Sequence, residues 1–146
     1  MTDELTADGA FETALRTLRH RERSVEELDR RLADRGFSEE SRSDALARLT
    51  RTGLLDDSRF AEARAASLAR RGAGDERIRQ DLRAAGVARE IVEAAIAELD
   101  PESTRAERVV ARRGATPKTA RYLSANGFSA EVVAGTVASD DGEALR

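Results

Sequence analysis

Arginines are the residues of this sequence best suited to bind a ligand. Arg105, Arg108 and Arg112 are spaced i, i+3 and i+7, so on a helix their guanidinium groups would share one face. A guanidinium group binds phosphates and carboxylates through paired hydrogen bonds. The spacing predicts a binding patch for nucleic-acid phosphates or an acidic protein surface; a solvated helix face remains the alternative reading.

Other basic residues extend this pattern. The predicted patch continues with three further side chains, Arg113, Lys118 and Arg121. In the register of the repeat described below, Arg70 and Arg71 correspond roughly to Arg112 and Arg113, which suggests a basic ridge at one corner of successive units. Arg16, Arg19 and Arg23 show the same i, i+3, i+7 spacing near the N-terminus, but Glu12 and Glu22 lie close enough to neutralise part of that charge.

Residues for catalysis are scarce. The chain has one histidine, His20, and no cysteine, so it lacks a Cys–His pair, a Ser–His–Asp arrangement and a histidine-based metal cluster. The stretch RRGAGDERIR lacks the Lys-Ser/Thr of a P-loop. Asp56 and Asp57 stand at the start of a predicted helix, where carboxylates stabilise the N-terminus by capping and by charge. We therefore expect no enzyme activity, no metal and no cofactor.

Composition indicates small helical units. Hydrophobic residues make up 40% of the 146 residues but aromatic residues only 3%, so Ala, Leu and Val must form the core. No apolar run approaches the roughly 20 residues of a membrane span, and we expect a cytoplasmic protein with no membrane contact. The net charge is −3, yet residues 101–128 carry six bases and two acids, a local charge of +4.

The sequence repeats itself around three glycines. Gly36, Gly86 and Gly127 end the similar stretches LADRG, LRAAG and LSANG. Apolar residues recur four and eighteen positions before each glycine and one and ten positions after it, offsets that combine threes and fours and so mark the buried face of helices. Thr119 stands at a usually apolar position, eight before Gly127. Each glycine suits the left-handed position after a helix C-terminus.

Helix starts recur at matching places. Ser24 and Glu27 form a capping box, Asp75 is the expected cap in the second unit, and Thr116 precedes a proline at the first helical position. Ser38 and Ser129 are expected to cap the helix after the glycine, where Ala88 is a weaker start. A further helix should precede each of these pairs, over about 9–22, 57–71 and 101–113.

These patterns predict an all-α protein of three tandem three-helix repeats that form an elongated, curved array. The units would span residues 9–55, including a linker, 56–100 and 101–139. Acidic, flexible ends are expected at residues 1–8 and 140–146.

Two stretches resemble the RecX family of bacterial regulatory proteins. One is LRHRERSVEELDRRLADRGF, and the more specific one is GLLDDSRFAEARAASLARRG, which contains the run from Gly53 to Asp57 followed by Arg59, Phe60 and Ala61. The similarity covers about residues 11 to 138. The third unit departs most from the family pattern, through Thr119 and an acidic C-terminus, although Tyr122 and Leu123 still match.

The resemblance implies a protein that binds the RecA recombinase filament on single-stranded DNA, lies along its groove, and restrains its ATPase, its extension and strand exchange. Direct contact with DNA phosphates is a second expectation, and we expect a monomer. The alternative is a helical protein that binds single- or double-stranded DNA directly, because helix pairs joined by a glycine turn resemble helix-turn-helix units. Against this alternative, no helix carries the Asn, Gln and Arg mixture typical of base recognition.

Overall fold

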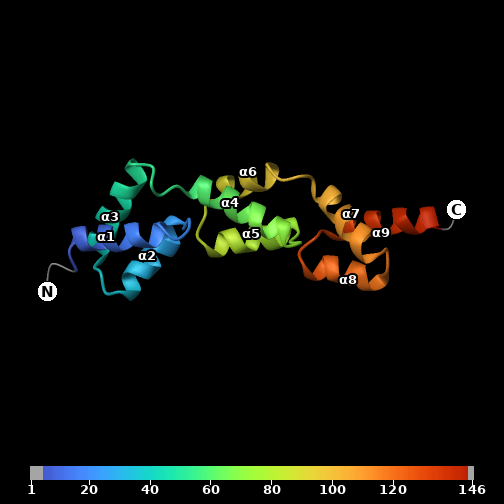
Figure 1. The fold of residues 1–146 in the computed structure, drawn as a ribbon, viewed down its shortest axis with the longest axis horizontal. Coiled ribbons are helices and arrows are strands. Elements are labelled where there is room, and N and C mark those ends of the chain that lie inside the picture. Colours follow the sequence, from blue (N-terminus) through green and yellow to red (C-terminus); the bar gives the residue numbers. More distant parts are fainter. Residues whose placement is uncertain (1–4, 145–146) are drawn as a thin grey trace.

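The computed structural model describes residues 5–144, and the side chains of residues 5–138. Within these residues the chain forms nine α-helices and no strand (Figure 1). The helices are α1 (Ala7–Leu18), α2 (Val25–Asp34), α3 (Glu39–Arg51), α4 (Asp57–Arg70), α5 (Asp75–Ala84), α6 (Arg89–Ala97), α7 (Glu102–Arg113), α8 (Pro117–Ala125) and α9 (Ala130–Ala144).

The helices form an elongated row that follows the order of the chain. α1–α3 lie at one end, α4–α6 in the middle and α7–α9 at the other end (Figure 1). Among the described residues each group of three has its own hydrophobic cluster. The predicted all-α fold of tandem helical repeats is confirmed.

The repeated apolar positions form these clusters. Leu32, Leu82 and Leu123, four residues before the three glycines, are completely buried. The residues after the glycines are also buried, including Phe37 and Phe128. The periodicity in the sequence therefore identified the residues that hold each unit together.

Thr119, at a usually apolar position, is buried as well. Its hydroxyl lies 3.2 Å from the Thr116 hydroxyl, and its backbone N–H donates to that same Thr116 oxygen. The buried hydroxyl is thus hydrogen-bonded, and the third unit keeps a core at this position despite its departure from the apolar pattern.

Most predicted helix caps are confirmed. Ser24 and Glu27 form a complete capping box, and Ser38, Asp56 and Thr116 each accept hydrogen bonds from the first turn of the next helix. The Ser129 hydroxyl accepts a hydrogen bond from the backbone N–H of Val132. The three repeat glycines all have positive φ, as predicted.

The predicted Asp75 cap is wrong. Gly74 is the N-cap of α5 and offers no side-chain hydrogen bond, while Asp75 is the first residue inside the helix. The physical reason is that α5 begins against the next unit, whose side chains and carbonyls satisfy the N–H groups there. Glu102 accepts from the backbone N–H of Asp75 at 2.6 Å.

Several helix ends differ from the prediction. α1 spans Ala7–Leu18 rather than 9–22, and α9 continues to Ala144, so both helices enter stretches predicted to be flexible ends. Residues 1–4 and 145–146 of those predicted ends lie outside the described residues.

Successive units are joined through their middle helices. The N-terminus of α2 meets the C-terminus of α5, and the N-terminus of α5 meets the C-terminus of α8, so the three helices follow one another along one side of the molecule (Figure 1). At the first junction the Ser24 hydroxyl donates to the Ala85 carbonyl at 2.6 Å. At the second, the Gly74 backbone N–H donates to the Asn126 carbonyl at 2.7 Å. Ser24 and Gly74 occupy the same repeat position, and so do Ala85 and Asn126.

A carboxylate from the next unit caps the first two middle helices, α2 and α5. The Val25 backbone N–H donates to Asp57 Oδ1 at 2.8 Å, and the Asp75 backbone N–H donates to Glu102. Asp57 and Glu102 are the first residues of α4 and α7. The N–H groups that a helix start leaves unpaired are therefore satisfied across the junction, which fixes each unit against its neighbour.

Candidate partner-binding surface

A hollow between the second and third units gathers several of the predicted arginines. We call it the α4–α7 hollow. Its volume is 360 Å³, and its lining comprises Ala66, Ala69, Arg70, Gly72, Glu98, Leu99, Asp100, Arg105, Arg108, Val109, Arg112 and Phe128. Arg70 from the end of α4 and Arg112 from the end of α7 thus line one depression, although 42 positions separate them in the sequence.

The exposed cations of this hollow differ in how far they are neutralised. Arg108 makes an ion pair with Asp100 at 2.8 Å, with both side chains 59% exposed. Arg70 and Arg112 are exposed and make no ion pair within the residues that the structure describes. An exposed pair in water is weak, so an incoming anion would meet two free guanidinium groups and a third that exchanges partners at small cost.

Arg105 does not belong to the exposed patch, and this part of the prediction is wrong. The residue is only 7% exposed. Its guanidinium group donates to the carbonyls of Asp100 at 3.0 Å and Ala73 at 2.9 Å and pairs with the Asp75 carboxylate. Because the second unit covers this side of α7, Arg105 holds the junction together instead of facing a partner.

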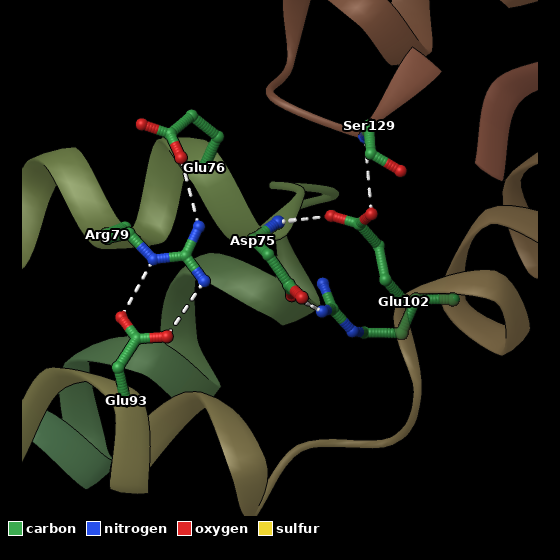
Figure 2. Close-up of polar contacts among 7 residues, drawn as sticks. Asp75, Glu76, Arg79, Glu93, Glu102 and Ser129 are labelled. Carbon is green, nitrogen blue, oxygen red and sulfur yellow. Dashed lines mark hydrogen bonds and ion pairs between the residues drawn. The ribbon is translucent and has the colours of Figure 1, made fainter. Parts of the chain in front are cut away.

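Burial at the junction changes the titration of Asp75. Burial raises the pKa of its carboxyl above the usual range, and the nearby Glu102 acts in the same direction, whereas Arg105 opposes them. Figure 2 shows Glu102 between the two units, with one oxygen accepting from the Asp75 backbone and the other from the Ser129 backbone. Two carboxylates and one guanidinium therefore form a single network across the junction.

A second network of charged side chains lies within the second unit, between α5 and α6. Arg79 donates to both oxygens of Glu93, at 2.8 and 3.0 Å, and to Glu76 at 2.9 Å (Figure 2). The hydrogen bonds that Arg79 donates to Glu93 and Glu76 raise the pKa of Arg79, and the bond from Arg79 lowers the pKa of Glu93. This guanidinium ties α5 to α6 and is not available as a binding group.

Four further predicted residues are exposed but lie outside the α4–α7 hollow: Arg71, Arg113, Lys118 and Arg121. Arg113 stacks over the Tyr122 ring, with its guanidinium carbon 3.6 Å from the ring centroid. The side chain therefore lies against α8 of its own unit. Of the four residues in the predicted ridge, Arg70 and Arg112 thus line the hollow, and Arg71 and Arg113 do not.

The N-terminal set is rearranged because α1 ends early. After Leu18 the chain leaves the helix, so Arg16, Arg19 and Arg23 do not share a helix face as predicted. Arg16 and Arg23 instead line a hollow within the first unit, and Arg19 does not. Arg31 of α2 and Arg35, the C-cap of that helix, line the same hollow and were not predicted from the sequence. Their spacing of four residues at a helix C-terminus was the available signal.

Neither a metal site nor a membrane-spanning helix is found in the described part of the chain. None of its His, Cys, Asp and Glu side chains form a group of three or more that could hold a metal ion. Within the described residues, no helix is long and apolar enough to cross a membrane. The arrangement offers guanidinium groups in shallow hollows, which bind anions by charge and hydrogen bonding.

The fold and this surface define a protein of tandem helical repeats with cations gathered in two hollows. The model of the second three-helix domain of RecX matches residues 56–96, and that of the first matches residues 10–49. The chain belongs to the RecX family of regulatory proteins.

Similar proteins support the assignment to the RecX family over almost the whole length of the chain. The Regulatory protein RecX of Halorhodospira halophila is 36% identical over 145 residues, which covers 92% of this chain and 90% of the relative. That of Pseudomonas fluorescens is 35% identical and covers 88% and 90%. A crystal structure of RecX from Lactobacillus salivarius has the same fold, with a TM-score of 0.77 at 21% identity, over 97% of this chain and 99% of that one.

Proposed function

We propose that this protein is a non-enzymatic modulator of RecA, which binds the RecA–DNA filament in its groove and inhibits RecA ATPase, filament extension and strand exchange. The observation that carries the proposal is membership of the RecX family over almost the full length of its relatives. We further propose that it acts as a monomer in the cytoplasm.

The elongated row of units supports a filament as the partner. A filament repeats along its axis, and successive units of residues 9–55, 56–100 and 101–139 would each meet a similar surface. Weak contacts then add through effective concentration, provided that the units are held at a fixed spacing. The hydrogen bonds from Ser24 and Gly74 across the two junctions supply such a constraint.

The α4–α7 hollow is the proposed contact. Arg70 and Arg112 are exposed and unpaired among the described residues, and they would bind acidic RecA side chains or DNA phosphates. Lys118 and Arg121 would add to the same positive field. Arg105 takes no part in this contact, because its guanidinium group is already bonded at the junction.

The test is ATP hydrolysis by RecA on single-stranded DNA, with this protein titrated in at substoichiometric amounts. We expect inhibition well below one copy per RecA. The variant Arg70→Glu/Arg112→Glu should inhibit at least tenfold less potently, whereas Arg51→Glu, an exposed arginine outside either hollow, should inhibit like the wild type. Absence of inhibition by the wild type at saturation would contradict the proposal.

Direct DNA binding is the alternative function, and the exposed arginines of both hollows favour it. It predicts binding to naked DNA with a steep salt dependence that RecA does not alter. Inhibition of RecA at protein concentrations too low for binding to naked DNA would rule it out as the main activity.

A further inference from the structure

A second hollow lies within the first unit, and its lining is almost entirely basic or hydroxylic. We call it the α1–α2 hollow. Its volume is 170 Å³, and it is lined by Thr13, Arg16, Thr17, His20, Arg23, Arg31 and Arg35. Arg16 comes from α1, Arg23 from the loop that follows, and Arg31 and Arg35 from the last turn and end of α2. Three separate stretches thus place four guanidinium groups around one small space, and no carboxylate lines it.

These cations are unpaired, unlike three other arginines of the same unit. Within the described residues none of the four makes an ion pair, whereas Arg30, Arg42 and Arg48 pair with Glu26, Asp29 and Asp8. Concentrating like charges without counter-charges is unfavourable. Binding an anion among these guanidinium groups would offset their mutual repulsion.

Arg23 also has a buried nitrogen that lacks a hydrogen-bond acceptor, the Nε of its guanidinium group. Burial lowers the pKa of Arg23, and the charges of Arg21 and Arg31 lower it further, while Glu27 acts in the opposite direction. A buried N–H without an acceptor costs free energy, and Arg23 lines the hollow without a counter-charge to offset that cost.

The size and lining of the hollow select the kind of anion. Pockets for drug-sized ligands have volumes of about 300 Å³ or more, so 170 Å³ suits one compact group. The lining holds no aromatic residue other than the imidazole of His20 and no large aliphatic side chain on which a base could rest. Guanidinium forks match the geometry of phosphate oxygens. A phosphate group fits these conditions.

An adjoining hollow suggests where the rest of the ligand would run. It measures 340 Å³ and shares Thr13, Arg16 and Arg35 with the α1–α2 hollow. Glu12 lines it, so the positive charge is concentrated in the first of the two. A ligand held by one phosphate could therefore continue along the surface, as a polymer does and a free nucleotide does not.

We propose that the α1–α2 hollow binds a backbone phosphate of a nucleic-acid strand, without base recognition. This deepens the phosphate contact within the proposed function. It is tested without RecA, so its failure and the failure of the filament proposal are distinguishable.

The experiment is a fluorescence anisotropy titration of the full chain onto labelled oligothymidine, between about 50 and 200 mM salt. The test variant is Arg31→Gln/Arg35→Gln, since both side chains are exposed and unpaired and their loss should leave the helical circular dichroism unchanged. Arg51→Gln, at the end of α3 in the same unit, is the matched control. Oligothymidine with an uncharged methylphosphonate backbone, inorganic phosphate and ATP serve as competitors.

We expect the double variant to bind at least about tenfold more weakly at low salt, the loss of one charge-assisted hydrogen bond or more. Its plot of log affinity against log salt should be shallower by about 0.7, because the hollow holds one phosphate and each phosphate contact on a single strand contributes about 0.7. The control should change neither value. Unlabelled oligothymidine should compete, and the methylphosphonate strand should not.

Four results would overturn the proposal. The first is that the wild type does not bind oligothymidine. The second is that the control loses as much affinity as the double variant, which would indicate that charge spread over the surface is responsible. The third is that the uncharged strand competes as well as oligothymidine. The fourth is competition by ATP or inorganic phosphate as effective as that by oligothymidine, which would make the ligand a free phosphate compound instead of a strand.

Discussion

The two junctions between units use equivalent positions of the repeat, but the two backbones approach each other more closely at the second junction than at the first. At the first, a serine hydroxyl spans the space between the α2 start and the α5 end. At the second, Gly74 has no side chain and its backbone N–H bonds directly to the Asn126 carbonyl. A Cβ atom on Gly74 would lie 2.4 Å from backbone atoms of Gly127 and Phe128. The second junction is therefore the closer one, and it relies on backbone contact.

The arginine at each junction follows the same trend. Arg59, near the start of α4, donates to Glu22 at 2.6 Å and to the carbonyls of Gly53 and Leu54, with its side chain 45% exposed. Arg105, near the start of α7, binds the preceding loop and the second unit with its side chain 8% exposed. The arginine at the first junction is thus partly exposed to solvent, whereas the arginine at the second junction is buried.

The largest difference should appear when each arginine is removed. Arg105→Met leaves the Asp75 carboxylate and two carbonyls without their donor in a buried site. We expect the free energy of unfolding to fall by about 3–5 kcal/mol, measured by urea denaturation.

Arg59→Met is the matched control. Its ion pair with Glu22 is exposed to solvent, so the free energy of unfolding should fall far less than it does for Arg105→Met. Equal effects of the two substitutions would show that the junctions do not differ in the way that the burial of these side chains indicates.

The close backbone approach can be tested with alanine in place of glycine. Gly127 has φ +89°, and a Cβ atom there would also meet the Arg77 backbone nitrogen at 2.5 Å. Gly36 has φ +92° with nothing within 4 Å of the added atom. Gly36→Ala should cost about 1–2 kcal/mol for backbone conformation alone, and Gly127→Ala about 1–3 kcal/mol more for the clash.

Thermal or urea unfolding of both glycine variants measures this difference. If they are equally stable, the second junction relaxes without cost and the backbone contact is not what holds it.

At the first junction the serine hydroxyl has two roles, since it caps α2 and bonds to the Ala85 carbonyl. Ser24→Ala should lower the free energy of unfolding by about 2 kcal/mol, the sum of a lost cap and a lost buried hydrogen bond. Ser38→Ala removes only a cap from an exposed position and should cost about 1 kcal/mol. A cost for Ser24→Ala no greater than that for Ser38→Ala would contradict a role for Ser24 across the junction.

The smallest expected effect concerns pH at the second junction. Because the pKa of Asp75 is raised in the folded chain by burial, the folded state holds this proton more tightly than the unfolded state. The contribution of Asp75 to stability should therefore fall as the pH rises through the range above the usual aspartate pKa of about 3.9. Asn in its place cannot titrate.

The measurement is the difference in free energy of unfolding between the wild type and Asp75→Asn, from about pH 4 to pH 6. The difference should shift against the wild type as the pH rises. A shift in the opposite direction would mean that the pairing with Arg105 outweighs the burial of the carboxyl.

Much of the fold could be predicted because its determinants are local. Apolar spacing identified residues such as Leu32 and Leu123, and the caps at Ser24 and Thr116 were evident within four residues of sequence. These interactions lie within one helix or one turn, so spacing is enough to find them.

The junctions were missed because their partners are remote in sequence and are mostly backbone atoms. Arg105 looked like part of a surface patch, since helix spacing tells which residues share a face but not which face the next unit covers. Gly74 carries no side chain to indicate that a carbonyl of residue 126 lies against it. For the same reason Arg31 and Arg35 were overlooked: their hollow exists only once α1 ends at Leu18 and α2 turns back.

The contact between Ser24 and Ala85 also has a consequence for synthesis on the ribosome. The two residues are 61 positions apart, so α2 leaves the exit tunnel long before its neighbour can cover it. At about 5–20 residues per second, that interval lasts roughly 3–12 seconds. During this time the newly made first unit depends on its own leucine core, and each later unit then docks onto one that is already folded. Assembly would thus proceed in the direction of translation, with the first junction, at Ser24, forming before the second, at Gly74.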